Sequence, residues 1–307
     1  MQRHLTAIRL SSVHTFFQTS SDTDLLGCYA WNQAVASGLL PILGDFEVAL
    51  RNTLHAALSQ HYKTDDWMMT ALLHPSNPQT PRKYVQAKHK MTPRSLGDIF
   101  SVIDKIKQRK GQATPNDVIA ALTFGFWEQL IKSLDHRSHP KILQETILKS
   151  ALPHAPDTAK IPYSSPQFKD RVTKLLACIR DVRNRIGHHD SLWTTPEFDE
   201  HGKVGFFPRR PRHSVNSLRL LAERLCWLMG WIDPAIPAYI RKSDHWYSYQ
   251  ALLSREALAI YRSKGGYAGS YQAVLDAIAP PARRTSRHRP AFLERLKHQH
   301  YIGNYHY

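Results

Sequence analysis

The sequence predicts an all-α protein. Apolar residues recur at steps of three and four along several segments, whereas the alternation typical of a half-buried strand is scarce. Glycine, at 14 of 307 residues, is too rare for a turn-rich β architecture, and proline is moderate at 19. With 42% apolar residues the chain predicts a folded protein with a sizeable core, arranged as one large domain or two modest ones.

Two helices are expected between residues 24 and 62. Asp24 is a suitable N-cap for the first, and Pro41 precedes the second, whose apolar residues follow a helical spacing. Residues 74–94 contain four prolines and predict a loop, which has no acidic residue. We expect its cations to bind RNA: Arg82, Lys83, Lys88, Lys90 and Arg94.

Three shorter helices are expected next. One covers residues 96–110, and another runs from its cap Thr114 to Leu134, with a proline at its first position. Residues 141–150 form a short amphipathic helix, and prolines interrupt the pattern over 153–166.

The strongest helical pattern covers residues 167–187. Its apolar residues form one buried stripe. Gly187 is a natural place for this helix to end, so we expect His188 and His189 at a helix terminus. Residues 194–213 are irregular and include a basic segment with two aromatic residues. Its Arg209, Arg210 and Arg212 are further candidates for RNA binding.

The last predicted helices are less regular. Ser214 or Asn216 is expected to cap a helix, prolines punctuate residues 233–247, and two helical segments follow near 250–264 and 269–279.

Positive charge dominates the chain. Lys and Arg total 41 against 25 Asp and Glu, which gives a formal net charge of +16. Such a surplus attracts polyanions, so we expect nucleic acid as the partner, ahead of an anionic membrane. A generic basic protein is the alternative. The tail over 280–307 is also basic and is either solvated charge or an arm that contacts RNA.

The chain start predicts no targeting segment or membrane span. It lacks a continuous apolar leader, and no window approaches about 18 uninterrupted apolar residues. The cysteines Cys28, Cys178 and Cys226 are far apart, which favours free thiols in a reducing compartment. These features together predict a cytoplasmic protein. Since carboxylates with metal-ligand spacing are lacking, we expect no metal, and we also expect no cofactor.

The segment from Arg183 to His189 carries the chemistry. It holds permanent cations, a carboxamide and two imidazoles within seven residues. A guanidinium matches a phosphate, and an imidazole exchanges protons near neutral pH. Cleavage of RNA by its own 2′-hydroxyl requires this pair of functions. A solvated basic surface is the alternative interpretation.

Helical geometry brings these residues together. Asn184 and His188 are four apart and share a face, as do Arg185 and His189 on the neighbouring face. Arg183 lies five before His188, but its long side chain can reach toward the same phosphate.

Three sequence blocks resemble a known family. They are YAWNQAVASGLLPILGDFEVALRNTLH (29–55), DVIAALTFGFWEQLI (117–131) and RDVRNRIGHHDSLW (180–193). Together they resemble the Abi-like proteins of bacterial phage defence, a group of the HEPN superfamily of helical ribonucleases. The resemblance implies a HEPN-like helical bundle. The additional helices and the basic C-terminal extension that we also expect lie outside the resemblance, which covers roughly residues 24–232.

The resemblance also implies an activity and a site. It implies a metal-independent endoribonuclease, a toxin or growth-arrest effector, with Arg183 and His188 catalytic and Asn184 shaping the site. His189 is an alternative to His188. Glu47 and Arg51 form either an ordinary helix pair or a support for the cleft.

The resemblance implies RNA as the substrate and a second copy of the chain in a homodimer. A further possibility is an interaction module held by a partner, such as an antitoxin protein or a small RNA that masks the cleft. A non-catalytic RNA-binding or scaffold protein is the alternative function. We expect four regions: an N-terminal segment (1–23), the family domain (24–232), a helical extension (233–279) and the basic tail (280–307).

Overall fold

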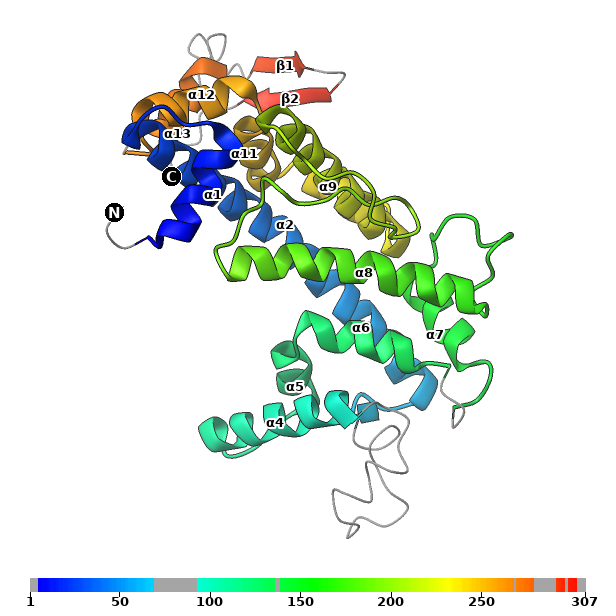
Figure 1. Cartoon of the computed structure of the whole chain (residues 1–307). Helices are drawn as coiled ribbons and strands as arrows, with labels where there is room; N and C mark the ends of the chain where they lie inside the picture. The colour runs from blue at the N-terminus through cyan, green and yellow to red at the C-terminus, as the bar shows by residue number, and fades with distance from the viewer. Residues whose placement is uncertain are drawn as a thin grey trace.

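The computed structural model describes residues 5–68, 93–135, 139–267, 269–278, 291–295 and 298–302. Helices dominate this part of the chain, as predicted (Figure 1). In chain order the elements are α1 (Ala7–Phe17), α2 (Asp22–Tyr62), α4 (Pro93–Lys110), α5 (Pro115–Ala121), α6 (Phe124–Ser133), α7 (Leu143–Ala151), α8 (Pro166–Gly187), α9 (Pro211–Ile232), α10 (Ala235–Ile240), α11 (Asp244–Leu252), α12 (Arg255–Lys264), α13 (Ser270–Ile278), β1 (Ala291–Arg295) and β2 (His298–Ile302).

Helix α2 is a single helix of 41 residues, so the prediction of two helices over 24–62 was wrong. Pro41 lies inside it, where a proline removes one backbone hydrogen bond. The helix continues because its buried stripe continues on both sides, with Leu39 and Ile42 fully buried. Asp24 was also misassigned: Ser21 is the N-cap, and its hydroxyl accepts a hydrogen bond from the Asp24 N–H at 3.2 Å.

The helix expected from Thr114 to Leu134 is two helices. Thr114 caps α5 as predicted, in a capping box with Asp117 and with a proline at the first helical position. The chain then turns extended at Leu122 and Thr123 before α6 begins. This break directs the apolar face of α6 into the core, where Trp127 is fully buried.

Helix α9 begins earlier than predicted. Its N-cap is Arg210, not Ser214 or Asn216. The Ser214 hydroxyl instead donates to the Trp193 carbonyl at 2.7 Å, which joins the start of α9 to the segment after α8. Beyond it, the segment expected near 250–264 is the pair α11 and α12, separated at Leu253 and Ser254.

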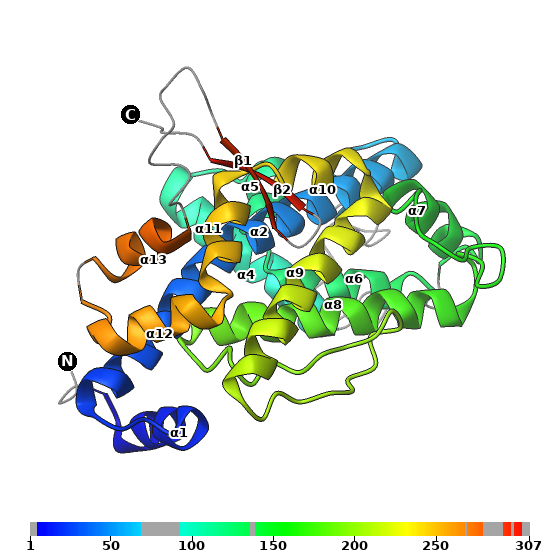
Figure 2. The same cartoon turned by 90° about the horizontal axis from the view of Figure 1, so that it is seen from above.

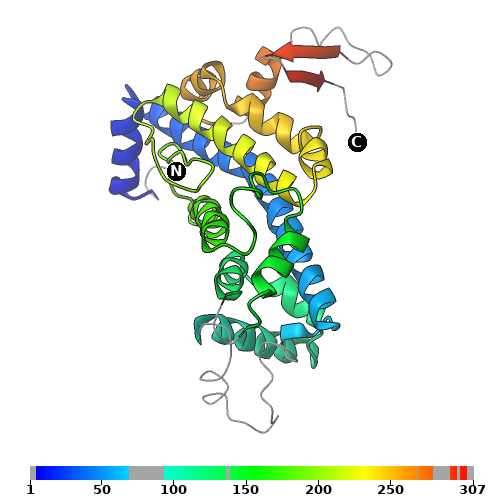
Figure 3. The same cartoon turned by 90° about the vertical axis from the view of Figure 1, so that its right-hand side faces the viewer.

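The helices surround α2, which runs through the length of the molecule (Figures 1 and 3). Its N-terminal half lies with α1, α9, α11 and α12, and its C-terminal half with α4 to α7. Helix α8 crosses between these two groups, as the view from above also shows (Figure 2). Helices α11 and α12, from the expected C-terminal extension, therefore pack on the same central helix as the rest.

Within the described residues, α2 is the helix long and apolar enough to cross a membrane, judged by length and composition. One apolar stripe of this helix is buried in the protein, although Leu40 and Val48 are exposed. Trp31, Leu39 and Ile42 are fully buried, and α2 packs against α7, α9, α11 and α12. Its hydropathy is accounted for by its position at the centre of the core.

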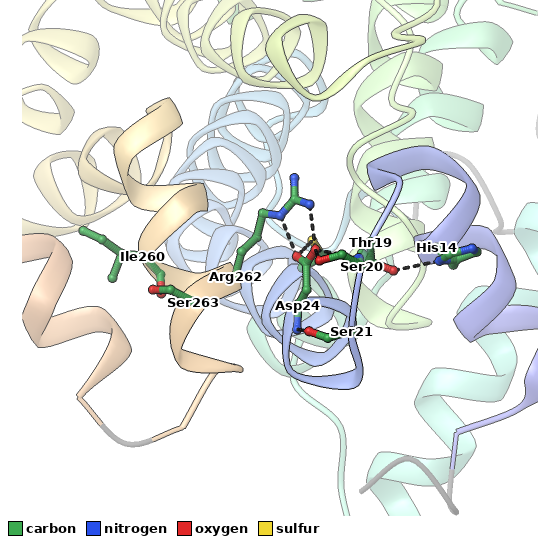
Figure 4. A network of polar contacts seen from close by, with 9 residues as sticks. His14, Thr19, Ser20, Ser21, Asp24, Ile260, Arg262 and Ser263 are labelled. Atoms are coloured by element: carbon green, nitrogen blue, oxygen red, sulfur yellow. Dashed lines mark hydrogen bonds and ion pairs between the residues drawn. The ribbon is translucent and has the colours of Figure 1, made fainter.

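An ion pair joins the N-terminal end of α2 to α12 (Figure 4). The Arg262 guanidinium donates to both carboxylate oxygens of Asp24, at 2.5 and 2.7 Å. The Ser20 N–H donates to the same carboxylate at 3.0 Å. These hydrogen bonds, led by that of Arg262, lower the pKa of Asp24 although its burial opposes the shift.

Part of the C-terminal tail forms two strands, which the sequence pattern does not predict. Strands β1 and β2 pair antiparallel, and Phe292 lies opposite Tyr301 in the register. The fold remains all-α, with this hairpin as an addition.

Candidate functional site

The candidate site lies at the C-terminal end of α8. Ser165 caps the start of this helix with a hydrogen bond from the Phe168 N–H (3.1 Å), and Pro166 occupies the first helical position. Its apolar stripe packs into the core, with Val182 and Ile186 buried. These contacts fix the last two turns, which carry the predicted catalytic residues.

The helix ends at Gly187, as predicted, but the left-handed residue is His189. Its φ of +52° is favoured by glycine and adopted by few other residues. The His189 N–H donates to the Ile186 carbonyl at 3.0 Å, and the Asp190 N–H to the Arg185 carbonyl at 2.7 Å. This pair of hydrogen bonds is a Schellman motif, which turns the chain sharply away from the helix.

Asn32 of α2 holds the segment that follows. Its side chain donates to the Asp190 carbonyl at 3.2 Å and accepts from the Leu192 N–H at 2.9 Å. Asn32 is 1% exposed, and its hydrogen bond with the Leu192 N–H is shielded from water. Trp193 then packs against Phe17 of α1 with ring centroids 5.5 Å apart. Sequence reasoning missed Asn32, which lies in the first family-like block without any motif of its own.

The arginines of the motif block have different surroundings. Arg180 forms an ion pair with Glu128 of α6, and the Arg185 guanidinium donates to the Ser191 carbonyl at 3.0 Å. Arg183 is exposed and, within the described part of the chain, has no hydrogen bond or ion pair through its side chain. Arg183 is therefore available to an external anion.

The two histidines differ in the same way. His189 shares a hydrogen bond with the Gln33 side chain at 3.2 Å, whereas the exposed His188 ring has no partner among the described residues. The His188 N–H donates to the Asn184 carbonyl at 2.9 Å, so these two residues lie one turn apart, as predicted. Asn184 is also exposed. Arg183 lies about 7.5 Å along the helix from His188 and about 140° around it.

Arg9 of α1 is a cation at this site that sequence reasoning missed. Its guanidinium lies 3.5 Å from the His188 carbonyl oxygen, a long hydrogen bond at the surface. Arg9 is separated from the motif by almost 180 residues in the chain, so only packing of α1 on α2 brings it here. The site therefore has the Arg9 guanidinium beside the backbone of His188, in addition to the exposed Arg183 on the preceding turns of α8.

Helix α6 supports α8 from the other side. Glu128 is fully buried and binds two cations, Arg180 and Lys132, the latter at 2.5 Å. A Cβ atom on Gly125 would lie 3.8 Å from Cδ of Arg180, so the helices approach closely at this point. This block belongs to the core, since Phe124, Phe126 and Trp127 are all buried.

Glu47 and Arg51 do not lie with the motif in one subunit. The motif meets α2 at Gln33, and Glu47 is 14 residues further along the helix, about 21 Å at a rise of about 1.5 Å per residue. They also form no ion pair with each other among the described contacts. Arg51 instead donates to the Ala120 carbonyl at the end of α5, at 3.3 Å.

The predicted RNA-binding cations fall into two groups. Arg209, Arg210 and Arg212 are exposed around the start of α9. The loop cations Arg82, Lys83, Lys88 and Lys90 lie outside the described residues, as does the side chain of Arg94.

Comparison with known proteins gives one match. A family model described as Abi-like protein matches residues 3–194, which is more than half of the chain and contains the whole candidate site. The match begins within the segment expected to precede the family domain, and it ends soon after Trp193. No curated protein and no solved structure matches the chain.

Proposed function

The chain belongs to the Abi-like protein family, a link to abortive infection and phage defence, and on this basis we propose that it is a metal-independent endoribonuclease of that defence. One observation carries the proposal. Of the basic side chains in the motif block, Arg183 and His188 have no partner among the described residues, and both are exposed near the end of α8, about 140° apart around the helix.

The proposed reaction is attack of the RNA 2′-oxygen on the neighbouring phosphorus. A base removes the proton of the 2′-hydroxyl, the bond between phosphorus and the 5′-oxygen breaks, and an acid protonates that oxygen. The products are a 2′,3′-cyclic phosphate and a 5′-hydroxyl. The Arg183 guanidinium stabilises the additional negative charge on the phosphoryl oxygens, and Arg9 strengthens the positive field.

The need for a base and an acid favours a homodimer. His188 supplies one proton-transfer group, and a second copy of the chain, joined by a two-fold axis, brings another His188. The motif lies on an exposed surface in the single chain, so a second copy would also cover it and exclude water. An antitoxin protein or a small RNA that occupies the same surface would restrain the enzyme.

Cleavage of a labelled RNA in the presence of a chelator tests the proposal. We expect wild type to cut and to leave cyclic phosphate ends, detected by mass spectrometry. Arg183→Ala and His188→Ala should each lower the rate by at least about 100-fold, the usual contribution of acid–base catalysis. Light scattering on the same samples tests the dimer.

Matched controls are Arg255→Ala and His201→Ala, exposed residues outside the motif block, which should cut like wild type. The site assignment fails if the Arg183 and His188 variants also cut like wild type. Cleavage that disappears with chelator would implicate a metal, and RNA that is bound but left intact would indicate a non-catalytic protein.

A further inference from the structure

Two adjacent phenylalanines are exposed on the segment between α8 and α9. Among the phenylalanine side chains that the structure describes, only Phe206 and Phe207 are exposed, at 44% and 56%. Burial of a phenylalanine is worth roughly 1.5–3 kcal/mol, so this chain forgoes that stabilisation twice within two residues. Exposed aromatic residues that adjoin charged ones are typical of a binding surface.

The backbone around these phenylalanines is held in place. The Glu197 N–H donates to the Phe206 carbonyl at 2.8 Å, and the Gly205 N–H to the Glu197 carbonyl at 3.0 Å. The Ser217 hydroxyl fixes the Glu197 carboxylate at 2.6 Å. The Phe206 ring meets the His213 ring edge-on, with centroids 5.3 Å apart. The rings are therefore presented by a fixed segment.

Three arginines follow within six residues of Phe206. Arg209, Arg210 and Arg212 are exposed and have no ion pair among the described residues. Arg210 is the N-cap of α9, and the first turn of this helix contains no acidic residue. The positive end of the helix dipole therefore adds to the guanidinium charges. A polyanion with flat apolar groups complements this combination.

The segment is joined to the exit of the candidate site. Ser214, in the first turn of α9, donates to the carbonyl of Trp193, which is four residues beyond His189. The first turn of α9 is therefore attached to the segment that leaves the motif.

We propose that Phe206, Phe207, Arg209, Arg210 and Arg212 form a binding site for single-stranded RNA. The rings stack on bases, and the guanidinium groups bind the phosphates between them. Stacking requires bases whose faces are free, and these faces are covered in a duplex. The proposal rests on the proposed RNA substrate and specifies its class.

The test is fluorescence anisotropy in the His188→Ala background, so that the RNA stays intact. The probes are a labelled 12-nucleotide RNA and the same strand in a duplex, each titrated at several salt concentrations. Since a stacked base contributes about 1–3 kcal/mol, Phe206→Ala with Phe207→Ala should weaken single-strand binding by roughly 10-fold or more. Duplex affinity and the salt dependence should stay unchanged.

The arginine substitutions should act differently. Arg209→Ala, Arg210→Ala and Arg212→Ala together should weaken both probes and reduce the slope of log affinity against log salt, because phosphate contacts release counterions. Tyr239→Ala is the matched aromatic control, since Tyr239 of α10 is 71% exposed outside this segment. It should bind like wild type.

Three results would overturn the stacking site. One is an equal loss of affinity for the single-stranded and the duplex probe in the variant with both phenylalanines replaced by alanine. Another is full RNA affinity with Phe206→Leu and Phe207→Leu, which keep apolar area without a flat ring and would show that stacking is not required. The third is a changed oligomeric state, which would indicate a contact between copies of the chain.

The fate of this proposal can be separated from that of the nuclease. Phenylalanine variants that bind single strands like wild type, in a protein whose wild type cuts RNA, would exclude the stacking site alone. Selective loss of single-strand affinity, in a protein that cuts no RNA, would support the stacking site and exclude the nuclease.

Discussion

His189 shows how a single residue sets the geometry of the candidate site. It takes the left-handed position of the Schellman motif, with φ of +52°, where a residue with a Cβ atom costs about 1–2 kcal/mol more than glycine. This position directs its ring toward Gln33 and leaves His188 as the last residue aligned with the helix. The two adjacent imidazoles therefore have different roles in the structure.

Replacing His189 separates these roles. We expect His189→Gly to leave the free energy of unfolding unchanged or to raise it by up to about 1 kcal/mol, because glycine adopts this φ without strain. RNA cleavage should persist. His189→Ala, which removes the ring but keeps the Cβ atom, is the control and should be the less stable of the two. Loss of cleavage in both variants would assign proton transfer to His189 instead of His188.

Among the elements, α2 and α8 are coupled through Asn32. Asn32 binds the buried N–H of Leu192 and the part-buried carbonyl of Asp190. This contact fixes the turn after the motif, and with it the direction of the last helical turn. The motif therefore depends on a residue about 150 positions earlier in the chain.

Removing this side chain should destabilise the protein. Asn32→Ala leaves the buried Leu192 N–H unpaired, which costs about 1–3 kcal/mol, and also removes the part-buried hydrogen bond to the Asp190 carbonyl. We expect the free energy of unfolding, measured with urea, to fall by about 1–3 kcal/mol. Gln33→Ala is the neighbouring control and should cost less than about 1 kcal/mol, since its partner His189 is exposed. Similar losses in the two variants would contradict the role given to Asn32.

For the whole molecule, the Asp24–Arg262 ion pair joins segments 238 residues apart (Figure 4). A Cβ atom on nearby Gly27 would lie 2.2 Å from the Tyr261 carbonyl oxygen, so α2 and α12 touch at this point through their backbones. The two contacts hold the C-terminal helices against the family-matched region. The stability of the fold therefore depends on the charge of the Asp24 carboxylate.

This connection predicts a pH dependence. Because Arg262 lowers the pKa of Asp24 below its value of 3.8, the ion pair stabilises the fold above that value. The stabilisation is lost as the pH falls through the lowered pKa. We expect Asp24→Asn to reduce the free energy of unfolding by about 2 kcal/mol at pH 7, and this difference should shrink below pH 4.

The matched control is Asp22→Asn, an exposed acid in the first turn of the same helix. It should change stability by less than about 1 kcal/mol at either pH. If the difference in free energy of unfolding between wild type and Asp24→Asn stays the same from pH 7 to below pH 4, the charge of Asp24 makes no contribution to stability.

The sequence by itself determined the helical class, the family, and the position of the motif at the end of a helix. These features follow from local information: apolar spacing, the Thr114 cap with the proline that follows it, and the order of three blocks. Helix propensity and capping act over a few residues, so neighbouring residues in the sequence are enough to predict them.

Only the tertiary structure decided which polar side chains are left without a partner. Arg180, Arg183 and Arg185 are alike in the sequence. Glu128 forms an ion pair with Arg180, and the Ser191 carbonyl accepts a hydrogen bond from Arg185, which leaves Arg183 without a partner among the described residues. The same applies to Asp24, which reads as a helix cap and is an ion-pair partner. Pairing of charges and burial of a stripe across Pro41 depend on elements distant in the chain, and no local pattern encodes these contacts.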